Sequence, residues 1–500
     1  MPIKLGKTVG LSVVIVILLL AGCRAASELP PGEWPAQPTI TLGTMDPGAG
    51  EPSAPVATPS PTPTRTPPDA TAISYTVRPG DTLTRIAAYY NTTVQELMRI
   101  NGMSNADHLA VGQVLQITLV ADLVGPEAVL LPDSEAVYGP GYADFDVAEA
   151  TRNLPGFFTT YVETVGGRER TAAEIVQQVA ENYSVGPRVL LALLELRGGW
   201  LTDADPPPEA QQFPMRYTAQ AHWDGLYWQM SLAASAVNAG VYGWWGDTLW
   251  LVQTEDGNYA QFSPRINAAT AGVQRALAPG SADHAAWIAE VAQFDEVYRV
   301  LFGDPFRYAV EPLLPPDLES PEMVFPWPRG AMWYYTGGPH AGWGVNEAWA
   351  ALDFVTGERY LGCVTSRQWA TAVAPGTVLV SRDGIVFQAL DDDGFLGTGW
   401  VVLYMHIATE NRVAVGTRLV SGMRVGHPSC EGGVSTASHL HLARRYNGVW
   451  IAAHDPRWPM VLSGWTPGSA GRPYHGTMTK GDQVRTACEC WEARVNGLRH

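Results

Sequence analysis

Apolar residues recur with helical spacing through the middle of the chain. A threonine at position 171, an acid at 174 and apolar periodicity up to 180 are typical of a capped helix start. The mostly apolar stretch 185–194 predicts a second, buried helix. Further helices are expected at 231–239, 266–277 and 285–302. The pattern therefore predicts a central all-α domain over residues 140–318.

A different pattern follows towards the C-terminus. The apolar and β-branched run 400–407 predicts a strand that leads to His406. Residues i and i+2 of a strand point to the same face, so His439 and His441 would share one side of a sheet with Leu440 on the other. The imidazole side chains of His406, His439 and His441 are thus expected to lie close together in one cleft.

Catalytic zinc takes three nitrogen or oxygen ligands and keeps a fourth position for water, whose pKa the metal lowers. His340, Asp353 and one histidine of the 439/441 pair would supply three such ligands. A lone histidine in a strand is more often structural, and His340 alone would carry almost no weight. The combination predicts a zinc hydrolase with histidines to spare for proton transfer.

Two segments carry a family resemblance. Residues 335–340 read Tyr-Thr-Gly-Gly-Pro-His and residues 349–354 read Trp-Ala-Ala-Leu-Asp-Phe. They resemble the lysostaphin-type zinc endopeptidases, which cut peptide links in bacterial peptidoglycan, and within them the β-lytic branch. The commoner branch has a His-x-x-x-Asp pair, and the corresponding position in this chain is Trp349. The β-lytic branch has its histidine further upstream, as His340 stands thirteen residues before Asp353.

The resemblance implies a mainly antiparallel β peptidase domain over residues 319–485. It implies His340, Asp353 and His441 as ligands of one zinc ion per chain, with His406 and His439 as catalytic histidines. The implied activity is cleavage of the peptide cross-links of peptidoglycan. Relatives that have lost their ligands exist, so the alternative is a non-catalytic peptidoglycan-binding scaffold or an activator of other wall hydrolases. All five site residues are present, which favours the enzyme.

Residues 74–118 form a small α+β unit. A strand and turn over 75–83, helical spacing over 86–101 and a closing strand over 109–117 resemble the LysM carbohydrate-binding module. That module has a βααβ fold and binds N-acetylglucosamine polymers. The resemblance implies that the glycan strands of peptidoglycan are a partner of this chain.

The helix at 185–194, with the residues after it, vaguely resembles the lysozyme-like transglycosylases. Those enzymes need a general-acid glutamate at the end of that helix. The expected position is occupied by Arg197, and Glu195 lies two residues early. Two residues rotate a helical side chain by roughly 200°, to the far face. The domain 140–318 is therefore expected to be a degenerate, non-catalytic lysozyme-like domain.

The N-terminus predicts export. Two lysines precede the apolar run 9–20, which is too short to span a bilayer comfortably but suits a signal peptide. Residues 20–23 read Leu-Ala-Gly-Cys and resemble the lipobox of bacterial lipoproteins, which implies a signal peptide at 1–23 and lipid on Cys23. An uncleaved anchor or ordinary secretion are the alternatives. A disordered linker rich in Pro, Thr and Ser is expected at 24–73. The protein is thus expected in the cell envelope, anchored by lipid on the outer side of the cytoplasmic membrane, or secreted.

Composition narrows the partners. Five hundred residues suggest several domains. The net charge is −17, and lysine occurs only at positions 4, 7 and 480, so no basic patch points to nucleic acid as a partner.

Export from the cytoplasm permits disulfides between the cysteines. Cys363 and Cys430 flank the central strands and could pair, whereas Cys488 and Cys490 are too close in sequence for an easy bridge, and their role stays open.

Overall fold

The structure is a computed structural model that describes residues 71–500 except 78–80, 90–91, 107, 111, 120–122, 250, 346 and 360. The predicted signal peptide 1–23 with Cys23, and the predicted linker 24–73 as far as residue 70, lie outside these residues. Within the described part of the chain, no helix has the length and apolar character that a membrane crossing requires. All described residues belong to one compact unit, 41–500.

The first module has the predicted βααβ order. It consists of β1 (Thr71–Thr76), α1 (Leu83–Tyr89), α2 (Val94–Ile100) and β2 (Val114–Leu119), and the two strands pair antiparallel. The Thr93 hydroxyl accepts a hydrogen bond from the Glu96 backbone N–H and caps α2. The apolar positions of the sequence pattern form its core: Leu83, Ile86, Leu97, Leu115 and Ile117.

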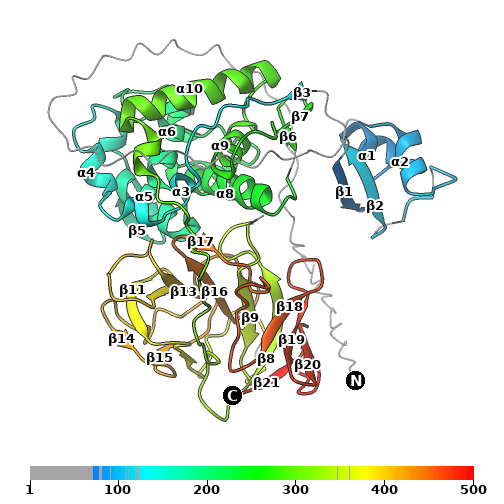
Figure 1. Cartoon of the computed structure of the whole chain (residues 1–500), viewed down its shortest axis with the longest axis vertical. Helices are drawn as coiled ribbons and strands as arrows, with labels where there is room; N and C mark the ends of the chain where they lie inside the picture. Colours follow the sequence, from blue (N-terminus) through cyan, green and yellow to red (C-terminus); the bar gives the residue numbers. More distant parts are fainter. Residues whose placement is uncertain are drawn as a thin grey trace, which may run out of the picture. The chain divides into compact units, whose positions relative to one another are not determined.

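The central domain contains all the helices that the pattern predicts, together with shorter ones (Figure 1). A capping box between Thr171 and Glu174 starts α5, as expected from the sequence. Every residue of α6 is buried, which agrees with its mostly apolar sequence. The helices are α3 (Asp133–Ala136), α4 (Val147–Thr151), α5 (Ala172–Tyr183), α6 (Pro187–Gly198), α7 (Pro208–Gln212), α8 (Leu226–Trp245), α9 (Ala268–Leu277) and α10 (His284–Phe302).

The expectation of an all-α central domain is not confirmed. An antiparallel hairpin joins β4 (Val162–Val165) to β5 (Arg168–Thr171), just before α5. A second small sheet pairs β3 (Leu123–Val124), β7 (Tyr259–Gln261) and β6 (Leu251–Gln253). Strands of two to four residues are too short to show a periodic pattern in the sequence.

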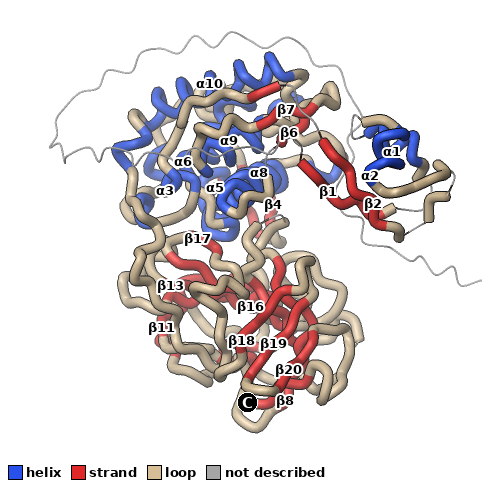
Figure 2. The backbone as a smooth tube through the Cα atoms, turned by 45° about the vertical axis from the view of Figure 1, so that its right-hand side comes forward, coloured by secondary structure: helices blue, strands red, loops and turns tan. Residues whose placement is uncertain are grey.

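The C-terminal domain is built on one antiparallel sheet with the strand order β14-β11-β12-β13-β16-β9-β8-β21, of which Figure 2 labels β11, β13, β16 and β8. The last strand lies beyond residue 485, the end that the sequence predicted for this domain, and pairs with β8. The strands are β8 (Met332–His340), β9 (Ala351–Val355), β11 (Gly376–Arg382), β12 (Ile385–Ala389), β13 (Trp400–Met405), β14 (Arg418–Leu419), β16 (Leu440–Tyr446) and β21 (Gly497–Arg499), and β17 (Val449–Trp450) also pairs with β16.

Two smaller sheets complete this domain. Strand β10 (Ala370–Thr371) pairs with β15 (Arg424–Gly426). Strands β18 (Thr466–Ser469), β19 (Gly476–Lys480) and β20 (Gln483–Thr486) form an antiparallel meander. The turn that joins β18 to β19 lies beside His340.

The two sides of the large sheet pack against different hydrophobic cores. Leu440 and Leu442 of β16 pack in a core that belongs to the C-terminal domain alone. Ala443 points the opposite way and shares a core with residues of α5, α6 and α8, as do Phe387 and Leu403 on the neighbouring strands. Side chains alternate along a strand, so His441 lies on the same face as Ala443. The helical domain therefore covers part of the sheet face that carries the expected metal ligands.

Candidate metal centre

Three expected ligands converge at the end of neighbouring strands. The Nε2 atom of His340 lies 3.0 Å from Nδ1 of His441 and 3.3 Å from Oδ1 of Asp353. Nδ1 of His441 lies 3.2 Å from the same carboxylate oxygen. All three residues are buried, and they form the group of potential metal ligands found within the described part of the chain. Strand pairing explains the convergence, because His441 stands directly opposite Asp353.

Backbone carbonyls fix the tautomers of the two histidines. Nδ1 of His340 donates to the carbonyl of Gly338 at 2.8 Å, and Nε2 of His441 donates to the carbonyl of Gly342 at 2.9 Å. The two nitrogens that face each other are then both acceptors. Oδ1 of Asp353 is buried and accepts no hydrogen bond. Three acceptors at such short distances repel one another unless a proton or a metal ion lies between them, and two nitrogens with one carboxylate oxygen are a donor set that fits a metal ion.

A glycine allows Asp353 to reach this position. The pairing of β8 with β9 shifts register around Gly337. A Cβ atom at Gly337 would lie 2.5 Å from Oδ2 of Asp353. Any side chain at this position would push the carboxylate away from the two histidines. The packing of Asp353 thus requires the first glycine of the Gly-Gly-x-His sequence.

The electrostatics of the three residues reflect the buried carboxylate. Burial raises the pKa of Asp353, but the neighbouring histidines outweigh it and hold this pKa well below its usual range. Burial opposes protonation of His340, yet Asp353 raises its pKa above the usual value. Burial lowers the pKa of His441. The carboxylate is ionised, as a metal ligand must be.

Two more imidazoles lie beside the three ligands. The ring centroids of His406 and His439 are 4.4 Å apart, and Nε2 of His439 lies 3.7 Å from Oδ1 of Asp353. His439 comes immediately before β16, and His406 immediately follows β13 with a φ of 65°. Burial lowers the pKa of His406 to about 3, so this imidazole is neutral.

One short segment holds both of these histidines. Nδ1 of His406 donates to the carbonyl of Glu431 at 3.1 Å, and the N–H of Ser429 donates to the carbonyl of His406 at 2.6 Å. The carbonyl of Ser429 accepts from the N–H of His439. Between them, Cys430 is bonded to Cys363 with an S–S distance of 2.10 Å. The pair that the sequence suggested is therefore joined in the structure, and it ties this segment to the loop after β9.

Tyr474 is a residue of this cluster that the sequence analysis missed. Its ring stacks on the imidazole of His340 with centroids 4.2 Å apart, and 55% of the residue is exposed. The carbonyl of Tyr474 accepts from the N–H of Gly338. It lies in the turn between β18 and β19, far from the ligands in sequence, and a single tyrosine carries no pattern that could have identified it.

Two residues that the sequence singled out lie elsewhere. Trp349 is half-buried beside His454, with ring centroids 6.0 Å apart, and does not belong to the ligand cluster. Its departure from the common His-x-x-x-Asp pattern therefore leaves the group of potential ligands intact.

Cys488 is bonded to Cys490. Their closeness in sequence predicted no easy bridge, but they are bonded, because a turn with a Cys490 N–H to Cys488 carbonyl hydrogen bond brings their Cα atoms to 5.3 Å.

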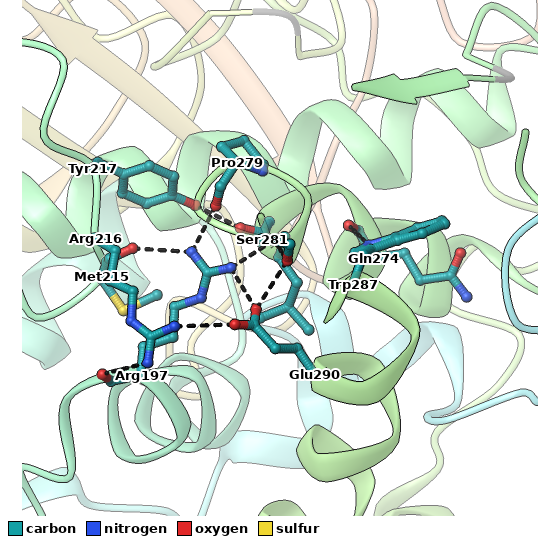
Figure 3. Close-up of polar contacts among 11 residues, drawn as sticks. Arg197, Met215, Arg216, Tyr217, Gln274, Pro279, Ser281, Trp287 and Glu290 are labelled. Atoms are coloured by element: carbon teal, nitrogen blue, oxygen red, sulfur yellow. Dashed lines mark hydrogen bonds and ion pairs between the residues drawn. The ribbon is translucent and has the colours of Figure 1, made fainter. Parts of the chain in front are cut away.

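The helical domain has no exposed acid at the position that a lysozyme-like enzyme uses. Glu195 is buried, and its carboxylate accepts from the Leu201 N–H at 2.7 Å and from the Thr202 hydroxyl. Arg197, at the position where the acid was expected, is a buried structural cation (Figure 3). It pairs with Glu290 at 2.7 Å and donates to three backbone carbonyls. Both side chains are thus held in buried contacts within the helical domain.

Comparisons with known proteins match these domains. A family model described as "LasA, N-terminal domain" matches residues 129–316, which coincide with the helical domain, and a "LysM domain" model matches residues 75–118. Protease LasA of Pseudomonas aeruginosa is 25% identical over 358 residues, which are 67% of this chain and 78% of that protein. Beta-lytic metalloendopeptidase of Achromobacter lyticus is 29% identical over 179 residues, which are 34% of this chain and 43% of that protein.

Solved structures also resemble part of this chain. A structure described as a novel M23 metalloprotease, pseudoalterin from the deep sea, is 22% identical. The alignment covers 36% of this chain and 98% of that chain, with a TM-score of 0.29.

Proposed function

We propose that this chain, a LysM-containing relative of LasA and the β-lytic metalloendopeptidases, is a zinc endopeptidase that cleaves the peptide cross-links of bacterial peptidoglycan. The observation that carries the proposal is the convergence of three buried acceptor atoms beside two further imidazoles. A scaffold that had lost its chemistry would not need to keep such a repulsive arrangement.

His340, Asp353 and His441 would hold one zinc ion through Nε2, a carboxylate oxygen and Nδ1. Two nitrogens and one oxygen are ligands that catalytic zinc takes, with a further position left for water or substrate. Bound zinc supplies a Lewis acid that polarises a carbonyl and lowers the pKa of water. The tautomers set by Gly338 and Gly342 keep the two histidine lone pairs directed at the metal.

His406 and His439 would carry the protons of the reaction. Each uses Nδ1 to donate to a backbone carbonyl, of Glu431 and Ala437 respectively, which leaves Nε2 available to substrate and water. A neutral imidazole accepts the proton of the attacking water, and an imidazolium then donates it to the leaving amine. The second imidazole, when protonated, stabilises the oxyanion that forms at the scissile carbonyl.

The other domains would bring this chemistry to its substrate. The LysM module would bind glycan strands and raise the local concentration of stem peptides near the peptidase domain.

Lipid on Cys23 would hold the chain at the outer side of the cytoplasmic membrane, from which the linker would let the folded domains reach the wall. Metabolic fatty-acid labelling should mark the wild-type protein and leave Cys23→Ala unlabelled. Equal labelling of the two proteins would contradict the anchor.

Digestion of purified peptidoglycan tests the reaction type. We expect new amino termini and no new reducing or anhydro sugar ends, with loss of product on chelation and in the His439→Ala variant. The LysM module should raise affinity for insoluble wall but should not be needed to cut a short soluble peptide. New sugar ends that persist in His439→Ala would assign the chemistry to another domain, and no products in zinc-replete buffer would favour the scaffold.

A further inference from the structure

Two large apolar side chains near the metal centre lie in solvent. Val434 is 93% exposed and Leu361 is 80% exposed, more than any other large apolar residue in the part of the chain that the structure describes. Single exposed apolar residues are common, but several in one place mark a binding surface. The bond between Cys363 and Cys430 joins the two loops that carry these residues. The disulfide therefore brings the two side chains to one region of the surface.

Val434 follows a glycine that lies against a histidine of the site. Gly432 and Gly433 have φ values of 75° and 69°, a left-handed conformation that glycine adopts without strain. A Cβ atom at Gly433 would lie 3.7 Å from Cε1 of His406 and 3.1 Å from Sδ of Met405. The backbone of Gly433 is thus in contact with the imidazole of His406, and Val434 is the next residue along the chain.

Leu361 stands in a similar relationship to the second histidine. The carbonyl of the next residue, Gly362, accepts hydrogen bonds from the N–H and the hydroxyl of Ser438, at 3.1 and 3.4 Å. Ser438 directly precedes His439. Each of the two loops therefore places one exposed apolar side chain beside one of the histidines that would carry protons.

Neither loop carries a charge next to these side chains. Residues 361–366 read Leu-Gly-Cys-Val-Thr-Ser, and residues 432–438 read Gly-Gly-Val-Ser-Thr-Ala-Ser. The charged residues before the two stretches are engaged elsewhere: Arg359 donates to a backbone carbonyl at 3.2 Å, and Glu431 accepts from the Thr409 hydroxyl at 2.5 Å. A charged group placed against this surface would lose water without gaining a counter-charge. The surface therefore suits an uncharged, apolar side chain.

We propose that Leu361 and Val434 determine specificity by binding an uncharged, apolar side chain of the substrate peptide, on the residue that follows the scissile bond. This proposal rests on the proposed endopeptidase function. The leaving amine belongs to the residue after the scissile bond, and it must lie against the imidazole that protonates it. The side chain of that residue therefore meets the surface beside His406 and His439.

Contacts of this kind should act on KM. An apolar contact with a substrate side chain forms when the peptide binds and persists in the transition state, so it lowers KM and leaves kcat unchanged. A single methylene in an apolar pocket discriminates between substrates by about 10- to 200-fold. On a surface open to solvent, we expect a discrimination of about tenfold for a whole leucine side chain.

Short soluble peptides that differ only in the residue after the scissile bond test the proposal on the full-length chain. The wild type should cut the leucine peptide with a kcat/KM at least about tenfold above that of the aspartate peptide. The double variant Leu361→Ser with Val434→Ser should raise KM for the leucine peptide by about tenfold and leave the glycine peptide unchanged. Leu361→Met with Val434→Ile keeps the apolar contact and should retain the preference.

Val484 provides the matched control. It is 51% exposed and lies in β20. The next residue, Arg485, donates to the carbonyl of Gly497. Gly497 pairs with Tyr334, at the end of β8 that is remote from His340. Val484→Ser should change neither kcat nor KM for any of the peptides.

Two results would overturn the proposal. One is an equal loss for the leucine and glycine peptides in the serine double variant, which would show a general defect. The other is an unchanged ratio between these peptides. If that unchanged ratio came with a smaller mass of the variant in sedimentation, the surface would be a contact between copies of the chain.

Peptide affinity of the metal-free chain separates this proposal from the endopeptidase function. Without its metal the chain should not cut, so fluorescence polarisation of labelled leucine and aspartate peptides measures binding alone. Tighter binding of the leucine peptide, lost in the serine double variant, supports the surface even if the zinc-loaded chain cuts no peptide, a result that contradicts the endopeptidase function alone. Cleavage of all peptides without a preference for leucine would contradict the surface and leave that function standing.

Discussion

Arg445, in strand β16, donates a hydrogen bond of 2.7 Å to the backbone carbonyl of Glu181, in helix α5, across 264 residues of sequence. The guanidinium is fully buried and also donates to the carbonyl of Leu396 at 3.3 Å. It lies between the rings of Phe387 and Trp450. This cation therefore joins the two domains on the sheet face that the helical domain covers.

Replacing Arg445 should destabilise both domains together. Arg445→Met keeps most of the side-chain volume but leaves two buried carbonyls without a donor, which costs about 1–3 kcal/mol for each group. We expect a single cooperative unfolding transition that is lowered by about 2–4 kcal/mol in chemical denaturation. Arg418→Met, which changes a mostly exposed arginine paired with Asp392, is the control and should change little. Two separate transitions, with only one of them shifted, would contradict this coupling.

The histidines of the site should separate into two groups by zinc content. His340→Ala should lose both zinc and activity because a ligand is removed. His406→Ala and His439→Ala should retain zinc and lose at least about a hundredfold in kcat, because they remove proton transfer alone. Metal analysis beside a peptidase assay checks this. Full zinc occupancy in His340→Ala would refute the ligand assignment.

Glu195 should be dispensable for catalysis. Glu195→Gln weakens the bonds to the Leu201 N–H and the Thr202 hydroxyl, so we expect a loss of stability of about 1 kcal/mol. Release of amino termini from peptidoglycan should be unchanged, since Glu195 lies in the buried end of α6. A variant that lost lytic activity at full stability would show that the helical domain takes part in the chemistry.

Glu347 should make stability depend on pH. Burial raises its pKa from 4.5 to about 7, so the protonated form is favoured in the folded state. The stability that the protonated Glu347 contributes is fully present below about pH 4.5, which is the pKa of this group in the unfolded chain. It is lost as the pH rises through about 7, the pKa in the folded protein. Tyr183 and Tyr242 are its titratable neighbours, and their pKa values are raised far above this range.

Thermal unfolding of metal-free wild type and Glu347→Gln across this range checks the pH dependence. The advantage of the wild type should shrink as the pH rises, because glutamine cannot ionise. A difference that stays constant, or that grows with pH, would contradict the assignment.

The sequence predicted what local pattern and motif spacing encode. Periodicity identified α5 and α6. Side-chain alternation predicted that His439 and His441 share a face, but it could not predict the strand register that places His441 opposite Asp353. The cluster of potential metal ligands could be predicted because its residue types are rare in combination and their spacing resembles a known family. The positions of Cys363 and Cys430 on either side of the central strands also suggested their pairing, which the structure contains.

Contacts between distant segments could not be predicted in this way. Tyr474 reaches His340 only because the turn after β18 folds back over it, and Asn238 reaches Glu347 only through the packing of the two domains. The carbonyls of Gly338 and Gly342 orient both ligand histidines, yet backbone atoms leave no mark on residue identity. Residues around the ligands are therefore revealed by three-dimensional proximity rather than by spacing.

The bond between Cys363 and Cys430 has a practical consequence for preparing the protein. A chain synthesised where thiols stay reduced would lack this crosslink, and the segment that holds His406 and His439 would lose its tether. The three ligands stand on or beside paired strands and do not depend on it. Material purified from a reducing cytoplasm would then carry a full complement of metal and still turn over slowly. Metal stoichiometry alone is a poor assay of quality for such a preparation, and free-thiol titration belongs beside it.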